Sequence, residues 1–524
     1  MVPWGTLFGA FVLYRAGLII YRLYLSPLAK FPGPKLAAAT SWYCAYHDIV
    51  RGGQYIWVIE EMHRKYGPIV RTMPGVLHVN DPAFLEKLYS QSPSTRRERA
   101  QTTLNLFQND KSVLPTRDHD LHRRRRAIIS RFFSQGNVRR LIPAINETLA
   151  DLLGRLEEWS RTDEPIVIGN AYRAATKDVI QSYALGEGRK FLHMKDFNAP
   201  FFDVLSPERL THVGVHFHWV LVVMAKLPPS IIVTLSPHVI GFITFLDGLA
   251  EQIEKIRNET EVSESKTIFH EILASNAPEV EKRTDRLVDE AMVLTIAGAD
   301  TTALTMVALT YHVLADPDVY ARLRAELESV MPDASQFPDP IKLDTLPYLN
   351  AVIEESLRLY PSGTHRQDRT APDDDLVFEY PGGPDGYGSS GRGGRKSLVI
   401  PAGTAVGMTA PIFNRHPAIY DDPGSFRPER YLENPRLHRR HLTFSKGARQ
   451  CLGMSLAYQE LQTFTAGLFR KYGVYDPQLG PGRQAGPTME LFETGIEDVK
   501  MWADFVTPGL RPGSKGVQIK IRQD

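Results

Sequence analysis

Ten residues near the C-terminus, FSKGARQCLG at positions 444–453, constrain this chain more than any other segment. They contain Cys451, one of only two cysteines among 524 residues, which argues against a disulfide framework, and a lone cysteine cannot build a zinc site by itself. One thiolate is enough, however, to ligate a haem iron. Gly447 permits a tight turn before Cys451, and the apolar pattern that follows predicts a helix whose N-terminus would stabilise a thiolate. The alternative is a buried structural cysteine, which is our interpretation of Cys44.

Other residues of this segment suit a haem-binding loop. Phe444 can shield the sulfur from water, and Arg449 can pair with a haem propionate because a guanidinium fork matches a carboxylate. Gly453 would let the following helix approach the porphyrin closely. We therefore expect Phe444, Gly447, Arg449 and Gly453 to contact the cofactor and Cys451 to bind the iron.

A second motif, AGADTT at positions 297–302, lies inside a long helical pattern over residues 284–316. Gly298 has no side chain, so a diatomic ligand can approach the helix there. The Thr301 hydroxyl can bond back to the carbonyl of Ala297 and open the helix locally. We expect Thr301 to hydrogen-bond dioxygen and Asp300 to relay protons from solvent. A patch of small residues for close helix packing is the alternative, and it is the commoner one for this motif alone.

Together these segments resemble the cytochrome P-450 family of haem-thiolate monooxygenases. Its cysteine loop reads F-x-x-G-x-R-x-C-x-G, and every specified position matches at 444–453. The motif at 297–302 is similar to the family's A-G-x-D/E-T-T. The resemblance implies a mainly α fold with small β-sheets, in which haem b lies between a long central helix and the cysteine loop. It also implies electrons from NADPH through an external cytochrome P-450 reductase, with cytochrome b5 as a further candidate donor.

A third motif, Glu355-Ser356-Leu357-Arg358, matches the family's E-x-x-R, whose spacing places both charges on one helix face. FRPERY at 426–431 resembles the family's F-x-P-x-R-F and supplies Arg430; Tyr431 stands where phenylalanine is usual. We interpret Glu355, Arg358 and Arg430 as a structural network that braces the haem side. A solvent-exposed ion pair is the alternative.

A basic helix is predicted over residues 119–133. The family often has W-x-x-x-R here, with both residues reaching the propionates, and this chain has His122 and Arg126 at those positions. The arginine run could instead be a solvated face or a docking surface for an acidic reductase. Farther along, Arg366 and Arg369 are both candidates for a propionate contact, and the offset favours Arg369.

The N-terminus predicts a membrane anchor. Residues 4–24 are apolar enough, and at ~1.5 Å per residue long enough, to cross a hydrocarbon layer of ~30 Å, although Arg15 lies mid-span. A signal peptide would need a basic start, which is missing, and a buried amphipathic helix is the other alternative. We divide the chain into an anchor (1–28), a Pro/Gly hinge (29–40) and a haem domain (41–524). Basic residues after the span predict a single-pass protein of the endoplasmic reticulum membrane whose catalytic domain faces the cytosol.

The rest of the chain predicts further elements and limits the partners. A helix is expected over 55–66, another over 345–360, and strands over 376–380 and 397–401 that flank a glycine-rich surface loop. A net charge of +1 gives no nucleic-acid footprint.

We expect a monooxygenase acting on a lipophilic small molecule, similar to filamentous-fungal members of secondary metabolism that act on terpenoids or polyketides. The variable segments near residues 100–115, 200–245 and 300 would line its substrate pocket. Residues 201–250 are predicted to be either core or a lipid contact, and the sequence favours neither. The alternatives are a haem-thiolate isomerase or dehydratase that does not use dioxygen, and a non-catalytic membrane-bound haem sensor or carrier.

Overall fold

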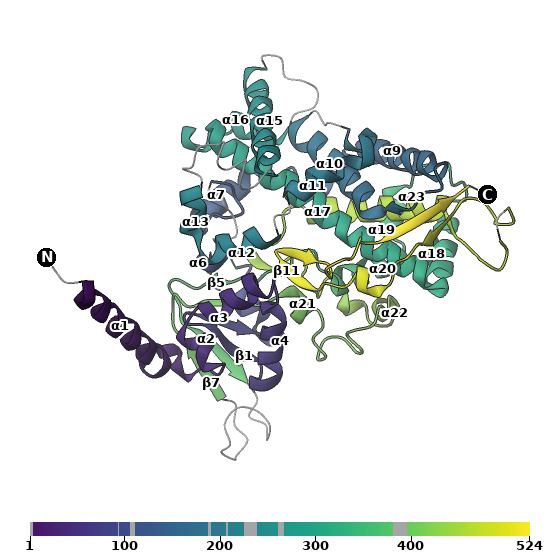
Figure 1. Ribbon diagram of the computed structural model, residues 1–524. Helices are drawn as coiled ribbons and strands as arrows, with labels where there is room; N and C mark the ends of the chain where they lie inside the picture. Colours follow the sequence, from purple (N-terminus) through teal and green to yellow (C-terminus); the bar gives the residue numbers. More distant parts are fainter. Residues whose placement is uncertain are drawn as a thin grey trace.

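A computed structural model describes residues 4–92, 94–104, 111–186, 190–205, 208–224, 238–259, 267–380, 396–480 and 482–523. In these residues the chain is mainly helical with small sheets, as the sequence predicts (Figure 1). The glycine-rich loop between the strands near 376 and 400 lies outside the described residues, as does most of the proline-interrupted stretch around 225–237.

The α-helices are α1 Trp4–Ile20, α2 Lys35–Ala39, α3 Trp42–Ala45, α4 Tyr55–Tyr66, α5 Leu85–Leu88, α6 Gln101–Leu104, α7 His119–Ser130, α8 Gln135–Arg139, α9 Ile142–Ser160, α10 Ile168–Leu185, α11 Ala199–Leu205, α12 Glu208–His216, α13 His218–Met224, α15 His238–Asn258, α16 Ile268–Ala274, α17 Thr284–Ala315, α18 Pro317–Val330, α19 Pro340–Asp344, α20 Pro347–Leu359, α21 Ala410–Phe413, α22 Glu429–Glu433 and α23 Met454–Lys471. The helices expected over 55–66, 119–133, 284–316 and 345–360 are thus confirmed, with α7 ending three residues early.

The strands are β1 Ile69–Met73, β2 Val76–Val79, β3 Glu98–Arg99, β4 Ile166–Val167, β5 Arg369–Thr370, β6 Leu376–Tyr380, β7 Lys396–Ile400, β8 Ala405–Gly407, β9 Gly473–Val474, β10 Thr488–Leu491, β11 Ala503–Phe505, β12 Thr507–Gly509 and β13 Gln518–Arg522. Within the described residues they form a sheet of order β1-β2-β8-β5-β3, a sheet of order β4-β13-β10-β9, and the pairs β11-β12 and β6-β7. The expected strand pair near 376 and 400 is confirmed as β6 and β7.

The long helix α17 occupies the centre of the helical body, packed against α10, α15, α20 and α23 (Figure 1). Its buried residues occur around most of its circumference, as expected for a helix with neighbours on several sides. Small residues let the neighbours come close: a Cβ on Gly298 would meet the Ile180 side chain of α10 at 2.6 Å. The main apolar core therefore surrounds α17, and the site described below is built along this helix and α23.

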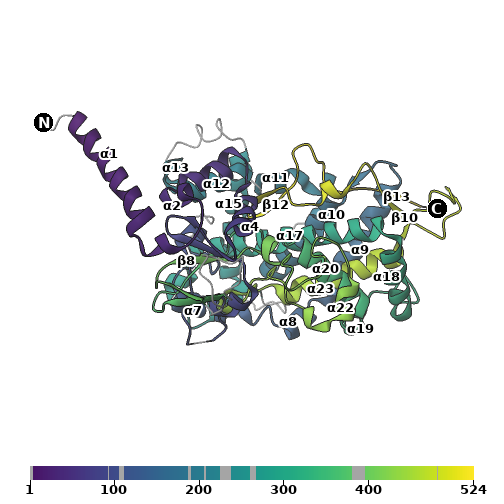
Figure 2. The same cartoon turned by 90° about the horizontal axis from the view of Figure 1, so that it is seen from below.

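The first helix, α1, projects from the body, and none of its residues is buried (Figures 1 and 2). With the π-helical turn Tyr21–Leu25 it is long and apolar enough to cross a membrane. By the same criteria α17 also qualifies, but it is half buried in the core, so length and apolarity alone are weak indicators. Exposure distinguishes the two helices and makes α1 compatible with an anchor.

The predicted Pro/Gly hinge at 29–40 is partly helical and packs against β1. Residues 31–34 are non-helical as expected, but α2 begins at Lys35, inside the predicted hinge. The Arg71 amide donates to the Pro32 carbonyl at 2.7 Å, and a Cβ on Gly33 would meet the Arg71 carbonyl at 2.6 Å. The Pro/Gly segment is therefore held against β1. Its backbone lies so close to β1 at Gly33 that a residue with a Cβ would not fit there.

Candidate active site

The loop before α23 folds as the spacing of its glycines predicts. Gly447 has φ +75°, and a Cβ there would meet the carbonyl oxygens of Tyr89 and Ser90 at 2.6 and 2.7 Å. Both the backbone conformation and the close approach require glycine. The Cys451 amide then donates to the Phe444 carbonyl at 2.8 Å and closes the loop, and Gly453 is the N-cap of α23. The loop thus presents Cys451 just before the start of a helix.

Cys451 is exposed as a residue, whereas Cys44 is buried. Many protein atoms nevertheless surround Cys451, and this desolvation raises the pKa of its thiol. The N–H groups of Gly453 and Met454 and the Arg126 guanidinium act in the opposite direction and lower the pKa. These donors are the groups that would stabilise a thiolate once a metal ion removes the proton.

Three buried arginines gather beside this loop: Arg99, Arg369 and Arg449. Arg449 donates to the carbonyls of Thr116 and Arg117 at 2.6 and 2.7 Å. Burial and the charge of Arg369 lower the pKa of Arg449 to about 9. Burial, Arg369 and Arg449 likewise lower the pKa of Arg99 well below its usual value. The site therefore concentrates positive charge away from water.

Helix α7 adds His122 and Arg126 to this region, as the sequence predicts. His122 is buried and Arg126 is partly buried, and Arg126 is close enough to Cys451 to lower the pKa of its thiol. Burial and the neighbouring arginines, Arg449 first, lower the pKa of His122 to about 2. His122 is therefore neutral at pH 7 and keeps one N–H donor, while Arg126 carries the charge.

From the sequence, both Arg366 and Arg369 are candidates for a propionate contact, and the structure gives them different partners. Arg366 donates to the carboxylate of Asp48 at 3.0 Å. Arg369 instead packs over the Tyr89 ring and lies near Ser445 of the cysteine loop. Arg369 is therefore the one that belongs to the arginine cluster.

Arg99 was not predicted from the sequence. It lies in β3 directly opposite Arg369 of β5, and like charges in that position repel. The local signal, one arginine in a two-residue strand, is too short to be recognised before the pairing of β3 with β5 is known.

On α17 the Thr301 hydroxyl donates to the Ala297 carbonyl at 2.7 Å, the expected back-bond. Gly298 faces α10, where the Ile180 side chain leaves no room for a Cβ, so close packing is enough to explain the glycine. Its expected role in admitting a diatomic ligand stays a prediction. Asp300 is the expected proton relay, and that role stays a prediction. It is buried against α10, where Arg173 Nε lies 3.4 Å from Oδ1. Burial raises the pKa of Asp300, and Arg173 and Lys177 oppose this rise.

A cavity of about 310 Å³ extends from Arg173 between α10, α17 and the C-terminal segment 498–517. Its wall is formed mostly by aliphatic side chains, among them Val167, Val307 and Met501. Since Arg173 contacts both the cavity and Asp300, the buried carboxyl is one side chain away from this space.

Glu355, Arg358 and Arg430 meet in a fully buried network. The Arg358 guanidinium binds both carboxylate oxygens of Glu355 at 2.7 Å, and Arg430 Nε donates to Oε1 at 3.0 Å. The backbone amide of Arg427 donates to the same oxygen at 2.8 Å. The solvent-exposed alternative is therefore wrong for this pair.

The family model for cytochrome P-450 matches residues 39–491. The chain belongs to the cytochrome P-450 family. It is 37% identical over 515 residues to the cytochrome P-450 monooxygenase tpcC of Cochliobolus heterostrophus, covering 97% of this chain and 95% of the relative. It is 38% identical over 520 residues to the cytochrome P-450 monooxygenase astB of Talaromyces wortmannii, covering 98% and 96%.

An N-acetyltryptophan 6-hydroxylase of Emericella nidulans is 33% identical over 534 residues, covering 99% of this chain and 97% of the relative. The relatives are therefore fungal monooxygenases matched along nearly their whole length, and this chain is an oxygenase of the same class.

Cytochrome P-450 enzymes hold a haem, and the residues present here fit that group. Haem carries two propionates, and Arg99, Arg369 and Arg449 supply concentrated buried positive charge beside the loop that carries Cys451. Carboxylates are the groups that best stabilise such arginines, through charge-assisted hydrogen bonds. The chemistry of the donor set thus suits a porphyrin with two acidic side chains and a thiolate-bound iron.

Proposed function

We propose that this cytochrome P-450 inserts one oxygen atom from dioxygen into a lipophilic small molecule of fungal secondary metabolism, a terpenoid or a polyketide. The observation that carries the proposal is the intact Asp300–Thr301 pair, with the Thr301 hydroxyl bonded to the Ala297 carbonyl. Enzymes that rearrange a substrate without dioxygen do not need this pair. The electrons would come from NADPH through an external reductase, with cytochrome b5 as a further donor.

Bound haem b supplies the activation of dioxygen, and Cys451 would ligate its iron. Arg99, Arg369 and Arg449 would hold the propionates, together with His122 and Arg126. Phe444, Gly447 and Gly453 shape the loop and helix start around the sulfur. The protein's part is to position the cofactor and to exclude competing reactions.

Thr301 and Asp300 would manage protons on the oxygen-binding side. Because the Thr301 hydroxyl donates its proton to Ala297, its oxygen is left to accept a hydrogen bond from a water or a hydroxyl group in the site. Asp300, whose pKa burial raises, can hold a proton close to Thr301, and Arg173 links it to the neighbouring cavity. Positioned proton transfer of this kind contributes typically ~10² to 10⁴-fold to rate.

The substrate class is tested by turnover of the full-length protein with a fungal reductase and NADPH. A panel of terpenoids, polyketides and aromatic amino acid derivatives is incubated with ¹⁸O-labelled dioxygen, and products are analysed by mass spectrometry. Indole compounds belong in the panel because one relative is named an N-acetyltryptophan hydroxylase. One labelled oxygen atom in a terpenoid or polyketide product supports the proposal. Product formation without dioxygen or reductase would show an isomerase or dehydratase instead, and ligand binding without any turnover would favour a sensor or carrier.

We further propose that α1 anchors the protein in the endoplasmic reticulum membrane and that the domain behind it also contacts lipid. Exposed apolar side chains, including Trp42, Val50 and Trp219, cover α2 to η3 (Tyr46–Val50) and α13. The rings of Trp42 and Phe217 are 5.1 Å apart and join the two parts of this surface. Figure 2 shows α2, α12 and α13 at the end of the molecule from which α1 projects.

Deleting residues 1–28 tests this proposal, because α1 has no buried residue and Leu28 is the one deleted residue that belongs to a core cluster among those the structure describes. The truncated protein should keep its haem spectrum and leave the membrane fraction only partly. Adding Trp42→Ser and Trp219→Ser should complete the release. Loss of haem on deletion would show instead that the segment belongs to the folded core.

A further inference from the structure

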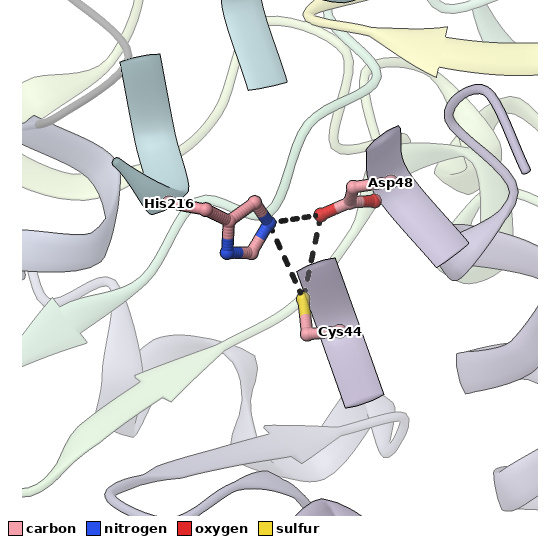
Figure 3. A group of neighbouring side chains, drawn as sticks. All are labelled: Cys44, Asp48 and His216. Atoms are coloured by element: carbon pink, nitrogen blue, oxygen red, sulfur yellow. Dashed lines mark hydrogen bonds and ion pairs between the residues drawn. The ribbon is translucent and has the colours of Figure 1, made fainter. Parts of the chain in front are cut away.

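A buried aspartate, Asp48, lies where distant segments of the chain meet. Its Oδ2 accepts a hydrogen bond from Nη2 of Arg366 at 3.0 Å and lies 2.9 Å from Nε2 of His216 and 3.3 Å from Sγ of Cys44. Figure 3 shows the His216 ring, carried by α12, pointing at the Asp48 carboxylate and the Cys44 thiol of the N-terminal helices. One carboxylate oxygen thus meets side chains of α3, α12 and the loop after α20.

Hydrogen bonding alone does not account for this arrangement. A carboxylate oxygen has two lone pairs, yet the Arg366 guanidinium, the His216 ring and the Cys44 thiol all converge on Oδ2 of Asp48. Oδ1 of the same carboxylate is buried and makes no hydrogen bond with any residue that the structure describes. A metal ion between the thiol, the carboxylate and the ring would occupy one lone pair of Oδ2 and leave the other to Arg366.

The spacing of the three donor atoms of Cys44, Asp48 and His216 fits one metal ion. All three lie within 4.8 Å of one another. The distance from Sγ of Cys44 to Nε2 of His216 is 3.8 Å, beside 2.9 and 3.3 Å for the two distances to Oδ2 of Asp48. Ligands that lie ~2.0 Å (N and O) and ~2.3 Å (S) from a tetrahedral zinc ion are ~3.3–3.6 Å apart. Each observed distance is within about 0.5 Å of that range, so small movements would complete the coordination.

A second histidine of α12, His212, offers the fourth ligand. Its Nε2 lies 2.5 Å from the backbone carbonyl of Asp504, and because a carbonyl only accepts, Nε2 carries the proton. In the neutral ring Nδ1 is then an acceptor; it is buried and has no hydrogen-bond partner in the described part of the chain. It lies 3.9 Å from Oδ2 of Asp48, which also accepts. A histidine that binds a metal typically donates its other N–H to a carbonyl or a carboxylate, as His212 does.

The carbonyl that orients His212 is itself fixed. The Asp504 amide donates to the Gly53 carbonyl at 2.9 Å, and a Cβ on Gly53 would meet the Asp504 carbonyl oxygen at 2.6 Å. The Asp504 carboxylate accepts from the Thr364 hydroxyl at 2.9 Å and lies 2.8 Å from Nδ1 of His365. The backbone of β11 therefore holds the His212 ring in one orientation, with Nδ1 toward Asp48.

We propose that a structural zinc ion fastens α12 to the N-terminal segment and β11. Its ligands are Cys44, Asp48, His212 and His216. A thiolate, two imidazoles and a carboxylate are ligands that suit zinc, and four protein ligands leave no open position, as in structural rather than catalytic sites. The two ligands of each segment are four residues apart, which brings their side chains close together on one helix face. None of the four belongs to the cysteine loop or to the arginine cluster beside it, so the site goes beyond the proposed oxygenase function.

The charges of the cluster support zinc. Asp48 and Asp504 are fully buried and carry −1 each, and Arg366 supplies +1, so with neutral imidazoles these three groups have an excess of −1. Burial and the charge of Asp48 raise the pKa of the Cys44 thiol well above its usual value, so without a metal the thiol keeps its proton. Zinc binding adds +2 and releases that proton, a net gain of +1. The ion therefore cancels the excess charge, which is unfavourable in a buried site.

Zinc content and the zinc X-ray absorption edge test the site without turnover. The full-length haem protein is purified in detergent with a tag that lacks histidines, incubated with zinc and then dialysed. We expect one equivalent of zinc for each haem iron. The zinc spectrum should show one sulfur ligand at ~2.3 Å and three N or O ligands at ~2.0 Å. The iron edge lies at a different energy, so the haem does not interfere.

Two variants remove one ligand each. Cys44→Ser removes the sulfur and His216→Gln removes a nitrogen, and each should retain at least about tenfold less zinc after dialysis because the site is left incomplete. The matched control is His218→Gln, which changes an exposed histidine two residues farther on and should bind as much zinc as wild type. Variants are compared at equal haem content, judged by the Soret band. If a variant does not fold, the wild-type zinc spectrum still decides the ligand set.

Removing the zinc tests whether it fastens α12. Hydrogen–deuterium exchange of peptides covering 208–216 is compared before and after treatment with a chelator, at one pH and with the haem in place. Exchange should become about tenfold faster or more without zinc, because a ligand that binds only the folded arrangement stabilises it. Equal exchange would contradict the role of the ion in holding this helix.

Three results would overturn the zinc site. These are a wild-type zinc content no higher than that of Cys44→Ser, a zinc spectrum without a sulfur ligand, and equal zinc in His216→Gln and His218→Gln. None of these measurements needs a substrate or a reductase. A failed zinc site is therefore distinguishable from a failed oxygenase assignment.

Discussion

Replacing Glu355 by glutamine should destabilise the protein by about 3 kcal/mol. The substitution keeps the shape of the side chain but removes the negative charge between Arg358 and Arg430, both of which are buried. Breaking a buried ion pair from one side costs ~3–5 kcal/mol. We expect the lower end because the Arg358 guanidinium also donates to the carbonyls of Asn414, Pro423 and Ser425, which stay in place. A loss of ~3 kcal/mol lowers the folded-to-unfolded ratio about 100-fold.

Urea unfolding of the haem protein, followed by circular dichroism and by the Soret band, measures this loss. The matched control is Glu328→Gln on α18, which breaks an ion pair with Arg324 that is partly exposed to solvent. Such a pair contributes ~0–1 kcal/mol, so the control should unfold close to wild type. If Glu355→Gln is no less stable than Glu328→Gln, the interpretation of the network as a structural brace is wrong.

Three further outcomes are expected. Cys451→Ser should abolish the red-shifted Soret band of the reduced carbon monoxide complex while Cys44→Ser keeps it; a retained band in the Cys451 variant would refute thiolate ligation. Thr301→Ala should bind haem and substrate normally but divert NADPH-derived electrons to hydrogen peroxide, and Thr301→Ser should restore coupling; full coupling in the alanine variant would mean that Thr301 only packs the helix. Although burial opposes ionisation, His441, His438 and Tyr458 hold the pKa of Glu354 at about 2, below its usual 4.5. The stability that Glu354 contributes is thus present above about pH 4.5 and lost as the pH falls toward 2, so Glu354→Gln should flatten the acid-unfolding curve in that window, and an unchanged curve would contradict this reasoning.

Features formed by residues close together in the chain could be predicted from the sequence alone. The turn at Gly447, the position of Cys451 before α23 and the back-bond from Thr301 to Ala297 involve residues within about one helical turn or one loop of each other. The same holds for the exposed helix α1, whose length and apolar composition are local properties. Local spacing also explains why α4, α17 and α20 were predicted close to their observed bounds.

The partners of a side chain that contacts distant segments of the chain could be identified only from the tertiary structure. Arg366 and Arg369 are three residues apart in sequence, yet one binds Asp48 and the other joins the arginine cluster. The sequence predicts Asp300 as a proton relay, but only the structure shows that α10 covers its carboxyl and supplies Arg173. Nothing near Asp300 in the chain indicates that helix.

The physical reason is that a buried charge is stable only beside its partner, and the partner is chosen by packing. Asp48 and Arg366 are separated by 318 positions in the chain, and Arg99 faces Arg369 only because β3 pairs with β5. The chain by itself determined the cysteine loop, the Ala297–Thr301 back-bond of α17 and the long apolar helix α1. The folded arrangement decided which arginines gather beside Cys451, what holds Asp300, and how α12 is fastened to the N-terminal segment.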